Sequence, residues 1–501
     1  MSACAVSPAL ADRSIDLAHV LADRLAIGSL AVRGLTMDSR TVRPGDAFVA
    51  LPGRVGHGLR HAAAAVAAGA AVVLYDAARG DRPSELGPGR ALAVPGLDRD
   101  FPLLADRAYG EPSAAARVLG ITGTNGKTTT AWLVASAFAA RGEAGGYIGT
   151  VGRGVLPAVE PATHTTPDVF SLQGTLRDLV DQGARHVALE VSSQGLDQGR
   201  TDGVRIYAAG FTNLTRDHLD YHGTMEAYVA AKAKLFAARD LRHAVVNVRD
   251  AAGAVFASSL ASGIQLTTVG ARSAVGGRYV LAVDVKPEIS GLVVRGESHE
   301  GPFCLHSALV GDFNAENLMV ALGLLLAADL PQEAAVTALA GVRAPPGRME
   351  IWQLPSGAVA VVDYAHTPDA LAHALRSLRL HCSGVLWCVF GCGGDRDRGK
   401  RPEMGAAAER LADRIVLTDD NPRSEDSAAI MADVAAGMAH PDRVRREADR
   451  RSAIAFACSA AGPGDVVLVA GMGHEEGQTY GGVRRPYSDR ATVARLAGAS
   501  S

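Results

Sequence analysis

The chain has 501 residues and a formal net charge of −3, with 48% hydrophobic and 21% charged residues. At roughly 100–200 residues per domain, this length predicts about three domains, and the ordinary globular composition argues against long disordered stretches. The small net charge gives no electrostatic reason to expect a nucleic-acid partner.

The first twenty residues contain no basic segment followed by an apolar one, so no signal peptide is predicted. The apolar runs, including the Ala-rich residues 61–74, are shorter than the ~18 unbroken apolar residues of a membrane span. The six cysteines form no Cys-x-x-Cys pair, which disfavours a zinc ribbon, and buried free thiols fit a reducing compartment. We therefore expect a cytoplasmic monomer with no membrane span.

The first block, residues 1–100, contains short strands and one Ala-rich helix. Residues 46–51 predict a strand, and residues 59–76 predict a helix that stops at Gly69 and is followed by a strand. The polar residues 76–90 then predict a loop or part of a linker.

The second and third blocks, residues 101–345 and 346–501, alternate strand-like and helix-like segments. In the second block a strand at 118–121 precedes a Gly-rich loop and a helix that ends at Gly142. This alternation predicts an α/β fold with parallel sheets covered by helices on both faces. In the third block four apolar strands each end in a polar, Gly-rich or acidic loop, and ligands bind at such strand ends in open α/β sheets.

The segment 123–129, Gly-Thr-Asn-Gly-Lys-Thr-Thr, has the character of a phosphate-binding loop. Glycines let backbone N–H groups surround phosphate oxygens, and the following helix N-terminus favours an anion. Lys127 can neutralise the β- and γ-phosphates, and the Thr128 hydroxyl can bind magnesium. The strict pattern requires glycine at position 121, where this chain has Ile121. An ordinary Gly-rich turn is the alternative. The expected ATP contacts here are Gly123, Thr124, Asn125, Gly126, Lys127, Thr128 and Thr129.

This loop resembles the nucleotide loop of the Mur ligases and the folylpolyglutamate synthases. Further segments resemble successive central-domain motifs of the Mur ligases: HTTPD (164–168), LEVSSQGLDQGR (189–200), residues 211–236, GDFNAENLMVAL (311–322) and GRMEIW (347–352). The resemblance covers nearly the whole chain. It implies a Rossmann-like N-terminal domain for UDP, a central P-loop-type ATPase domain with a parallel sheet, and a Rossmann-like C-terminal domain for the incoming amino acid.

Three residues in the second block are candidates for metal binding and catalysis. Glu190 ends a strand and His218 follows another, and a carboxylate and an imidazole suit magnesium or a phosphate-bridging position, although each alone is more often structural. Lys232 matches the lysine that is carbamylated in Mur ligases, which would convert a cation into an oxygen ligand for magnesium; Lys234 is the competing candidate. The expected catalytic residues are Lys127, Lys232 and His218, and the expected metal ligands are Thr128, Glu190, His218 and carbamylated Lys232.

The resemblance implies the remaining nucleotide and muramyl-peptide contacts. The UDP-muramyl-dipeptide would be bound by Ser39, His164, Thr165, Thr166, Ser192, Gln198 and Arg200, with Arg54 to Gly56 near the UDP. Further nucleotide contacts would be Asn314, Arg348, Asp363 and His366. Asn314 and Asn317 could equally be helix caps. His57-Gly58 departs from the Asp-Gly that is common in the family.

The segment Asp420-Asn421-Pro422-Arg423 resembles the DNPR motif of the diaminopimelate-adding Mur ligases. An Arg repels the bare cation of lysine but can pair in a fork with the extra carboxylate of diaminopimelate. A surface turn with a solvated Arg is the alternative. The expected diaminopimelate contacts are Arg396, Asp420, Asn421, Pro422, Arg423, Gly471 and Glu475. Met472 stands where the family usually has lysine.

These motifs imply an ATP-dependent ligase of peptidoglycan precursor synthesis. It would join meso-2,6-diaminopimelate to the D-glutamate of UDP-MurNAc-L-Ala-D-Glu through an acyl phosphate, with Mg²⁺ as cofactor and ATP as a substrate. These three small molecules would be its partners. The alternatives are the L-lysine-adding ligase of the same family and a non-catalytic muramyl-nucleotide sensor. The N-terminal block argues against a folylpolyglutamate synthase.

Overall fold

The computed structural model describes residues 14–53, 56–80, 86–87, 89–273 and 277–498. The chain forms two compact units. The first comprises Met1–Lys127, Gly142–Val246 and Asp250–Leu266, and the second comprises Thr128–Arg141, Asn247–Arg249 and Thr267–Ser501. The three domain ranges expected from the sequence stay a prediction. Arg54, and most of the segment considered for a signal peptide, lie outside the described residues.

The first unit begins with a small parallel sheet in the order β3-β4-β5-β6. Side chains of β4 and β5 alternate between two hydrophobic clusters, because successive strand residues point to opposite faces. The expected strand at 46–51 and the expected helix and strand within 59–76 are confirmed. The elements are β1 (Ile15–Asp16), α1 (Leu17–Val20), β2 (Ala31–Val32), β3 (Leu35–Thr36), β4 (Ala47–Ala50), η2 (Gly58–His61), α2 (Ala62–Ala67), β5 (Val72–Tyr75), β6 (Ala91–Ala93), α3 (Leu97–Ala108) and α4 (Pro112–Ala115).

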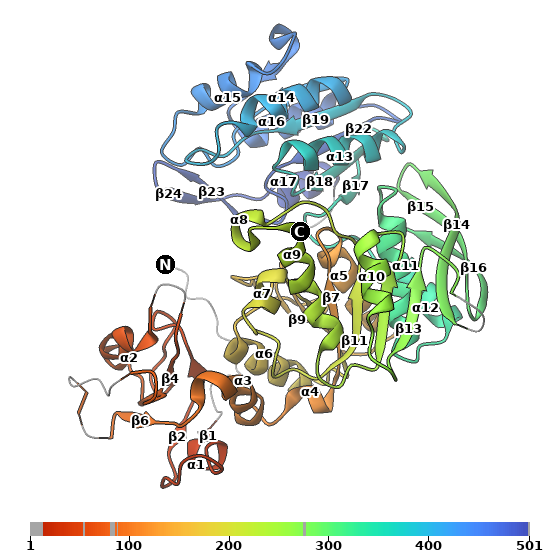
Figure 1. The fold of residues 1–501 in the computed structure, drawn as a ribbon. Coiled ribbons are helices and arrows are strands. Elements are labelled where there is room, and N and C mark those ends of the chain that lie inside the picture. Colours follow the sequence, from red (N-terminus) through yellow and green to blue (C-terminus); the bar gives the residue numbers. More distant parts are fainter. Residues whose placement is uncertain (1–13, 54–55, 81–85, 88, 274–276, 499–501) are drawn as a thin grey trace. The chain divides into compact units, whose positions relative to one another are not determined.

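Six further strands of the first unit pair in the order β12-β11-β7-β10-β8-β9, of which β7, β9 and β11 are labelled in Figure 1. All these pairings are parallel except that of β8 with β9. The central strand β7 is buried from residue 118 to its end, and the phosphate loop begins directly after it. The elements are β7 (Arg117–Thr122), β8 (Gly145–Ile148), β9 (Arg153–Val155), α6 (Val169–Asp181), β10 (His186–Glu190), α7 (Ser193–Asp197), β11 (Ile206–Phe211), α8 (Leu219–His222), α9 (Met225–Ala233), η3 (Lys234–Ala237), β12 (His243–Asn247) and α10 (Ala251–Ser258).

The second unit contains an antiparallel hairpin series that the sequence did not predict. Strand β14 pairs in parallel with β13 and antiparallel with β15, which pairs antiparallel with β16. Helices α11 and α12 pack against β14 and β16, respectively. The elements are α5 (Lys127–Ala140), β13 (Gln265–Val269), β14 (Arg278–Glu288), β15 (Gly291–Ser298), β16 (Gly301–Ser307), α11 (Asn314–Ala327) and α12 (Gln332–Ala340).

The rest of the second unit contains an antiparallel pair of strands, β23 and β24, and a six-stranded sheet in the order β17-β18-β22-β19-β20-β21. In the six-stranded sheet only the edge strand β17 is antiparallel. Alternate strand residues join two clusters, one with α13, α14 and α15 and one with α16 and α17. The elements are β17 (Glu350–Gln353), β18 (Val359–Asp363), α13 (Pro368–Arg379), β19 (Leu386–Phe390), α14 (Lys400–Leu411), β20 (Arg414–Leu417), α15 (Ser427–Ala435), η4 (Pro441–Arg443), β21 (Arg445–Arg446), α16 (Arg450–Ala460), β22 (Val466–Ala470), β23 (Gly477–Tyr480), β24 (Val483–Pro486) and α17 (Asp489–Leu496).

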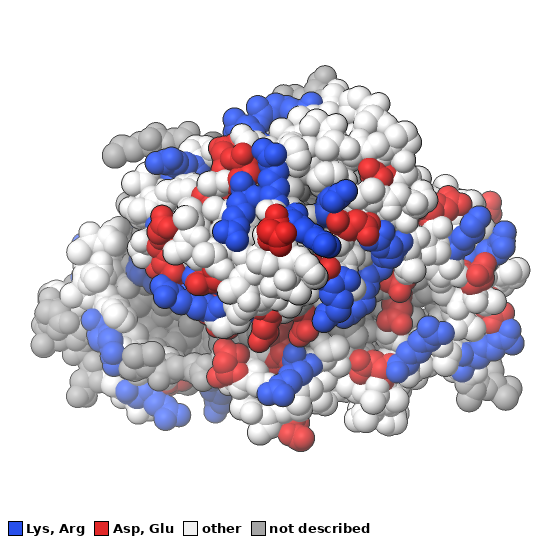
Figure 2. Space-filling model, turned by 90° about the horizontal axis from the view of Figure 1, so that it is seen from above, with Lys and Arg blue, Asp and Glu red and all other residues white. Residues whose placement is uncertain are grey.

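Two further observations concern the charges on the surface and the length and hydrophobicity of the helices. On the face drawn in Figure 2, Lys and Arg side chains are interspersed with Asp and Glu, in keeping with the small net charge. Among the residues that the structure describes, none of the helices combines the length and the apolar character that crossing a bilayer would take.

Candidate active site

The phosphate loop between β7 and α5 needs glycine at its first position. Gly123 has φ of 149°, and a Cβ atom there would lie 1.9 Å from the Thr212 hydroxyl oxygen. Gly126 also has positive φ, at 84°. Residues with a side chain rarely adopt these conformations, so the loop conformation depends on both glycines.

The start of the loop is tied to the residues that follow β11. The amide of Thr124 donates to the Asn213 carbonyl over 2.8 Å, and that of Asn125 to the Asn213 side-chain oxygen over 2.9 Å. The Thr212 hydroxyl donates to the Asn125 carbonyl over 2.6 Å. These two loop amides therefore bind protein oxygens, and the loop is held in shape by the neighbouring strand end.

Two lysine side chains converge on the carbonyl oxygen of Gly123. The Lys127 ammonium donates to the Gly123 and Thr124 carbonyls, each over 2.9 Å, and the Lys232 amine donates to Gly123 over 2.7 Å. The positive charge of Lys127 at this oxygen attracts an anion. The arrangement favours binding of a polyphosphate at the loop.

Lys232, on α9, is 1% exposed and lies against the ring of Tyr228, with 4.6 Å between its Nζ and the ring centroid. The Tyr228 hydroxyl in turn lies 3.0 Å from that of Thr124. Burial, and then the charge of Lys127, lower the pKa of Lys232 to about 6, although Asp217 opposes the change. At neutral pH the amine is therefore mostly uncharged, which is the form that attacks carbon dioxide.

Glu190 lies at the end of β10, and His218 directly precedes α8 in the segment after β11; their roles in metal binding and catalysis stay predictions. Glu190, at the end of β10, is fully buried and accepts hydrogen bonds from the Tyr147 hydroxyl (2.5 Å) and from the amide (2.9 Å) and hydroxyl (3.1 Å) of Thr150. His218 has φ of 53°, and burial lowers its pKa although Asp217 lies 3.5 Å away. Both side chains are oriented by neighbours.

Whether these residues can bind magnesium depends on the ligand atoms that their side chains supply. Within the described ranges, no group of three or more His, Cys, Asp or Glu side chains could hold a metal ion. Glu190 supplies carboxylate oxygens, but an unmodified Lys232 supplies none. Magnesium prefers oxygen ligands, so the residues fit it when Lys232 carries a carbamate.

Gly123→Ala is expected to lower ATP turnover about a hundredfold, because a misplacement of roughly 1 Å in a reacting group can cost this much. The new Cβ would displace Thr212 or the loop itself. Phosphate release from ATP measures the effect. Gly28→Ala is the control, since nothing lies within 4 Å of a Cβ there, and equal activity of the two variants would contradict the prediction.

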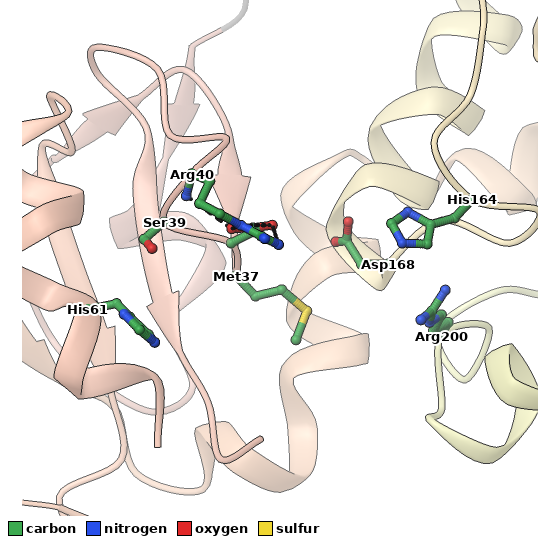
Figure 3. A pocket seen from close by; sticks show the side chains of 8 residues that line it. Met37, Ser39, Arg40, His61, His164, Asp168 and Arg200 are labelled. Atoms are coloured by element: carbon green, nitrogen blue, oxygen red, sulfur yellow. Dashed lines mark hydrogen bonds and ion pairs between the residues drawn. The ribbon is translucent and has the colours of Figure 1, made fainter. Parts of the chain in front are cut away.

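A cavity of about 560 Å³ in the first unit brings together three of the predicted muramyl-dipeptide contacts, Ser39, His164 and Arg200 (Figure 3). Its other lining residues were not predicted, although they lie in or near segments that were singled out: Met37, Asp38, Arg40, His61 and Asp168. Asp38 and Arg40 form a close ion pair with 2.6 Å between Oδ2 and Nη2, and the Arg40 hydrogen bonds hold the pKa of Asp38 low.

Three other predicted muramyl-dipeptide contacts, Thr166, Ser192 and Gln198, form a hydrogen-bonded network with Arg200. The Arg200 guanidinium donates to the Thr166 carbonyl over 2.6 Å and to the Gln198 side-chain oxygen over 2.7 Å. The Thr166 hydroxyl lies 3.1 Å from that of Ser192. Thr165 bonds instead to the hydroxyl of Thr150, the residue that also donates to Glu190.

Of the further nucleotide contacts predicted from the resemblance, Asn314 is 2% exposed, and its amide donates to the Val310 carbonyl over 2.7 Å. It accepts a bond from Asn317 over 2.8 Å, and no side chain caps α11, so neither asparagine is a cap.

The remaining predicted nucleotide contacts surround Tyr364. Arg348 lies over the Tyr364 ring at 4.7 Å from its centroid, and His366 bonds to the Tyr364 carbonyl. Asp363 accepts the Met349 amide over 2.8 Å, and burial raises its pKa.

The residues predicted to select the amino-acid substrate lie together at the carboxyl ends of β19, β20 and β22. The Asn421 side-chain amide donates to both Asp420 and Glu475, each over 3.2 Å. Arg423 has φ of 54°, and its guanidinium donates to the Gly394 carbonyl over 2.6 Å. Arg396 is exposed in the loop after β19. The result is a compact group of two carboxylates beside two guanidinium-bearing loops.

Glu475 lies close enough to Asp420 for the two carboxylates to repel each other. Burial and then the charge of Asp420 raise the pKa of Glu475, while the Asn421 hydrogen bond and Arg423 lower it. A ligand ammonium between the carboxylates would relieve this repulsion. Met472, at the position where the family has lysine, is fully buried.

Comparisons with known proteins identify the family of the chain. Three family models match the chain: "Mur ligase family, catalytic domain" at residues 31–88, "Mur ligase middle domain" at 121–325, and "Mur ligase, glutamate ligase domain" at 347–473. With relatives more than 40% identical over nearly its whole length, the chain belongs to the Mur ligase family, and the family predicted from the motifs is confirmed.

Among its relatives are enzymes named UDP-N-acetylmuramoyl-L-alanyl-D-glutamate–2,6-diaminopimelate ligase. That of Xanthomonas campestris pv. campestris is 47% identical and covers 96% of this chain and 97% of its own. That of Vibrio vulnificus is 43% identical and covers 97% and 99%. A solved structure with the same name is 36% identical, has a TM-score of 0.70 and covers 97% and 99%. These names agree with the main prediction and not with the lysine-adding alternative.

More distant solved structures show the fold alone. A D-alanyl-D-alanyl-adding ligase of Acinetobacter baumannii, at 18% identity, has a TM-score of 0.64 and covers 91% of this chain and 95% of its own. A MurF ligase of Thermotoga maritima was solved in complex with ADP, at 18% identity, a TM-score of 0.59, and 88% and 94% coverage. The predicted α/β fold is therefore confirmed.

Proposed function

We propose that this protein is an ATP-dependent amide ligase that joins meso-2,6-diaminopimelate to the D-glutamyl carboxylate of UDP-MurNAc-L-Ala-D-Glu. This is a cytoplasmic step of peptidoglycan precursor synthesis. The observation that carries the choice of amino acid is the meeting of Asp420, Glu475 and Arg423 around Asn421. Two carboxylates and a guanidinium match the ammonium and carboxylate groups at one end of diaminopimelate, whereas lysine ends in a bare ammonium.

The reaction begins with phosphoryl transfer from ATP to the glutamyl carboxylate, which forms an acyl phosphate and releases ADP. The amine of diaminopimelate then attacks the acyl carbon, the amide bond forms, and phosphate leaves. Lys127 neutralises charge on the transferred phosphoryl group, because it already lies across the loop on two carbonyl oxygens that a phosphate can replace. Arg200 and the Thr166–Ser192 pair hold the muramyl dipeptide.

We propose that Lys232 is carbamylated and that its carbamate, with Glu190 and His218, holds Mg²⁺; the Thr128 hydroxyl, next to Lys127 in the chain, adds a further oxygen. The support for this is the burial of Lys232 and its lowered pKa, since a neutral amine is the form that carbon dioxide modifies. Bound magnesium offsets the negative charge that develops at the transferred phosphoryl group.

Phosphate release from ATP is expected with UDP-MurNAc-L-Ala-D-Glu and meso-diaminopimelate together, and not when L-lysine replaces diaminopimelate. The physical reason is that Arg423 repels a second bare cation. Faster phosphate release with L-lysine than with diaminopimelate would support the ligase activity but contradict the assignment of the amino-acid site. No release with either amino acid would favour a muramyl-nucleotide sensor.

A further inference from the structure

Arg450, the first residue of α16, is buried beneath the proposed amino-acid site. Its side chain has no exposed surface, and neither has that of its partner Asp489. The guanidinium donates through Nε and Nη2 to the two Asp489 oxygens, each over 2.8 Å. It also donates to the backbone carbonyls of Asp419 (3.1 Å) and Ala470 (2.8 Å). One side chain therefore joins four acceptor atoms on three separate segments.

The two backbone carbonyls that Arg450 contacts belong to residues that directly precede residues of the proposed amino-acid site. Asp419 precedes Asp420 in the loop after β20, and Ala470 ends β22 and precedes Gly471. These strands are not neighbours, because β19 lies between them in the sheet. Backbone pairing of adjacent strands therefore does not set the distance between their loops directly.

The loops that Arg450 joins are closely packed at this point. A Cβ on Gly471, which has φ of 119°, would lie 2.7 Å from an Asp420 carboxylate oxygen and 3.8 Å from Nη2 of Arg450. A Cβ on Gly391, just after β19, would lie 2.1 Å from the Thr418 carbonyl. A change in the position of either loop therefore changes the position of Asp420 relative to the segment that carries Glu475.

Only arginine can make this set of contacts. Its planar guanidinium carries five N–H donors in a fixed fork, whereas lysine is a point charge on a flexible stem. Asp489 is itself held by the Tyr487 hydroxyl over 2.9 Å. Burying such an ion pair is costly and is offset only when its hydrogen bonds are made with good geometry.

We propose that Arg450 is a positioning residue for the acyl-acceptor site, which fixes the Asp420 loop and the Gly471–Glu475 loop at the spacing that diaminopimelate requires. The inference rests on the proposed function of that site. Arg450 itself does not touch the amino acid, and it acts through the two backbone carbonyls.

Arg450→Lys is expected to raise the KM for meso-diaminopimelate about tenfold to a hundredfold, because a loss of about 1 Å in positioning can cost up to that much. The KM for ATP is expected to stay within about twofold, since Arg450 donates to Asp419, Ala470 and Asp489, and none of these is a predicted nucleotide contact. Steady-state phosphate release from the full-length protein measures both constants. If Arg450→Lys does not fold, Tyr487→Phe tests the same set of contacts, with a smaller rise in the same KM.

Arg379→Lys is the matched control, since Arg379 lies in the same unit, pairs with Asp413 over 2.7 Å, and has a side chain that is 39% exposed. Its KM values should equal those of the wild type. An unchanged diaminopimelate KM in Arg450→Lys, or an equal rise in both KM values, overturns the inference. A wild-type protein without diaminopimelate-dependent release overturns the proposed function as well, so the two failures are distinguishable.

Discussion

Lys127→Ala is expected to lower ATP-dependent ligation by about a thousandfold or more, because removing a cation that neutralises a transferring phosphoryl group has effects of this size. The fold should be retained, since the side chain is partly exposed and its hydrogen bonds to Gly123 and Thr124 are made to carbonyls that can turn to water or to the remaining Lys232. Phosphate release measures activity, and circular dichroism with a thermal melt checks the fold.

Lys286→Ala is the matched control for that experiment. Lys286 is an exposed lysine on β14, in the antiparallel hairpin series of the second unit. Its removal should leave turnover unchanged. Turnover in Lys127→Ala comparable with that of Lys286→Ala would show that the phosphate loop is not the nucleotide site.

The parallel parts of the fold were predictable because their local signals agree. Strands β7, β18, β19 and β22 each contain a short apolar run, and each run is followed by glycine or a polar residue. Such runs are typical of strands that are buried on both faces, and they place candidate ligand loops at their carboxyl ends. The same pattern located the phosphate loop and the loop that contains Asp420 and Arg423.

The antiparallel elements were missed because they lack a clear pattern. The eleven residues of β14 mix buried, intermediate and exposed positions without strict alternation, and all four residues of β24 are exposed. An edge hairpin such as β23 with β24 is stabilised by pairing and by contacts to distant residues, as when Thr479 accepts the Arg423 amide. Tertiary contacts of this kind override local sequence signals.

The role of single charged residues also depends on contacts that are distant in sequence. Arg450 lies in the sequence Asp-Arg-Arg, which has the composition of a solvated surface, yet its partners are 20, 31 and 39 residues away. Similarly, Asn314 was considered as a helix cap, whereas its side-chain amide donates to Val310; its contact with nucleotide stays a prediction. Spacing along the chain identifies candidate residue types, and only the fold determines which atoms they contact.

Lys232→Met is expected to lower ligation about a hundredfold or more, because it removes both the amine and the proposed carbamate that would hold magnesium at the phosphoryl group. Methionine has an apolar side chain of similar length, which suits the buried position beside Tyr228. In the wild type, activity should rise when bicarbonate is added to buffer freed of carbon dioxide. A carbamate signal from isotope-labelled bicarbonate in nuclear magnetic resonance spectra should be present in the wild type and absent in Lys232→Met.

Lys234→Met separates this effect from the loss of a lysine on the same segment. Lys234 is about half exposed and pairs with Asp197 over 3.1 Å, so its replacement should leave both activity and the carbamate signal in place. A carbamate signal that survives in Lys232→Met but disappears in Lys234→Met would show that Lys234, and not Lys232, is the carbamylated residue.

The pH dependence of stability tests the buried amine independently of activity. In buffer without carbon dioxide, the pKa of Lys232 is about 6 in the folded chain and 10.5 for an ordinary lysine, so between these values the unfolded chain binds the extra proton. The free energy of unfolding should therefore rise with pH across this window, with the full penalty present below about pH 6. The rise should be larger in the wild type than in Lys232→Met by a few kcal/mol, since one pKa unit corresponds to about 1.4 kcal/mol. Urea unfolding at pH 6 and pH 9 measures this difference, and identical slopes in the two proteins would mean that Lys232 is charged in the folded state and is not ready for carbamylation.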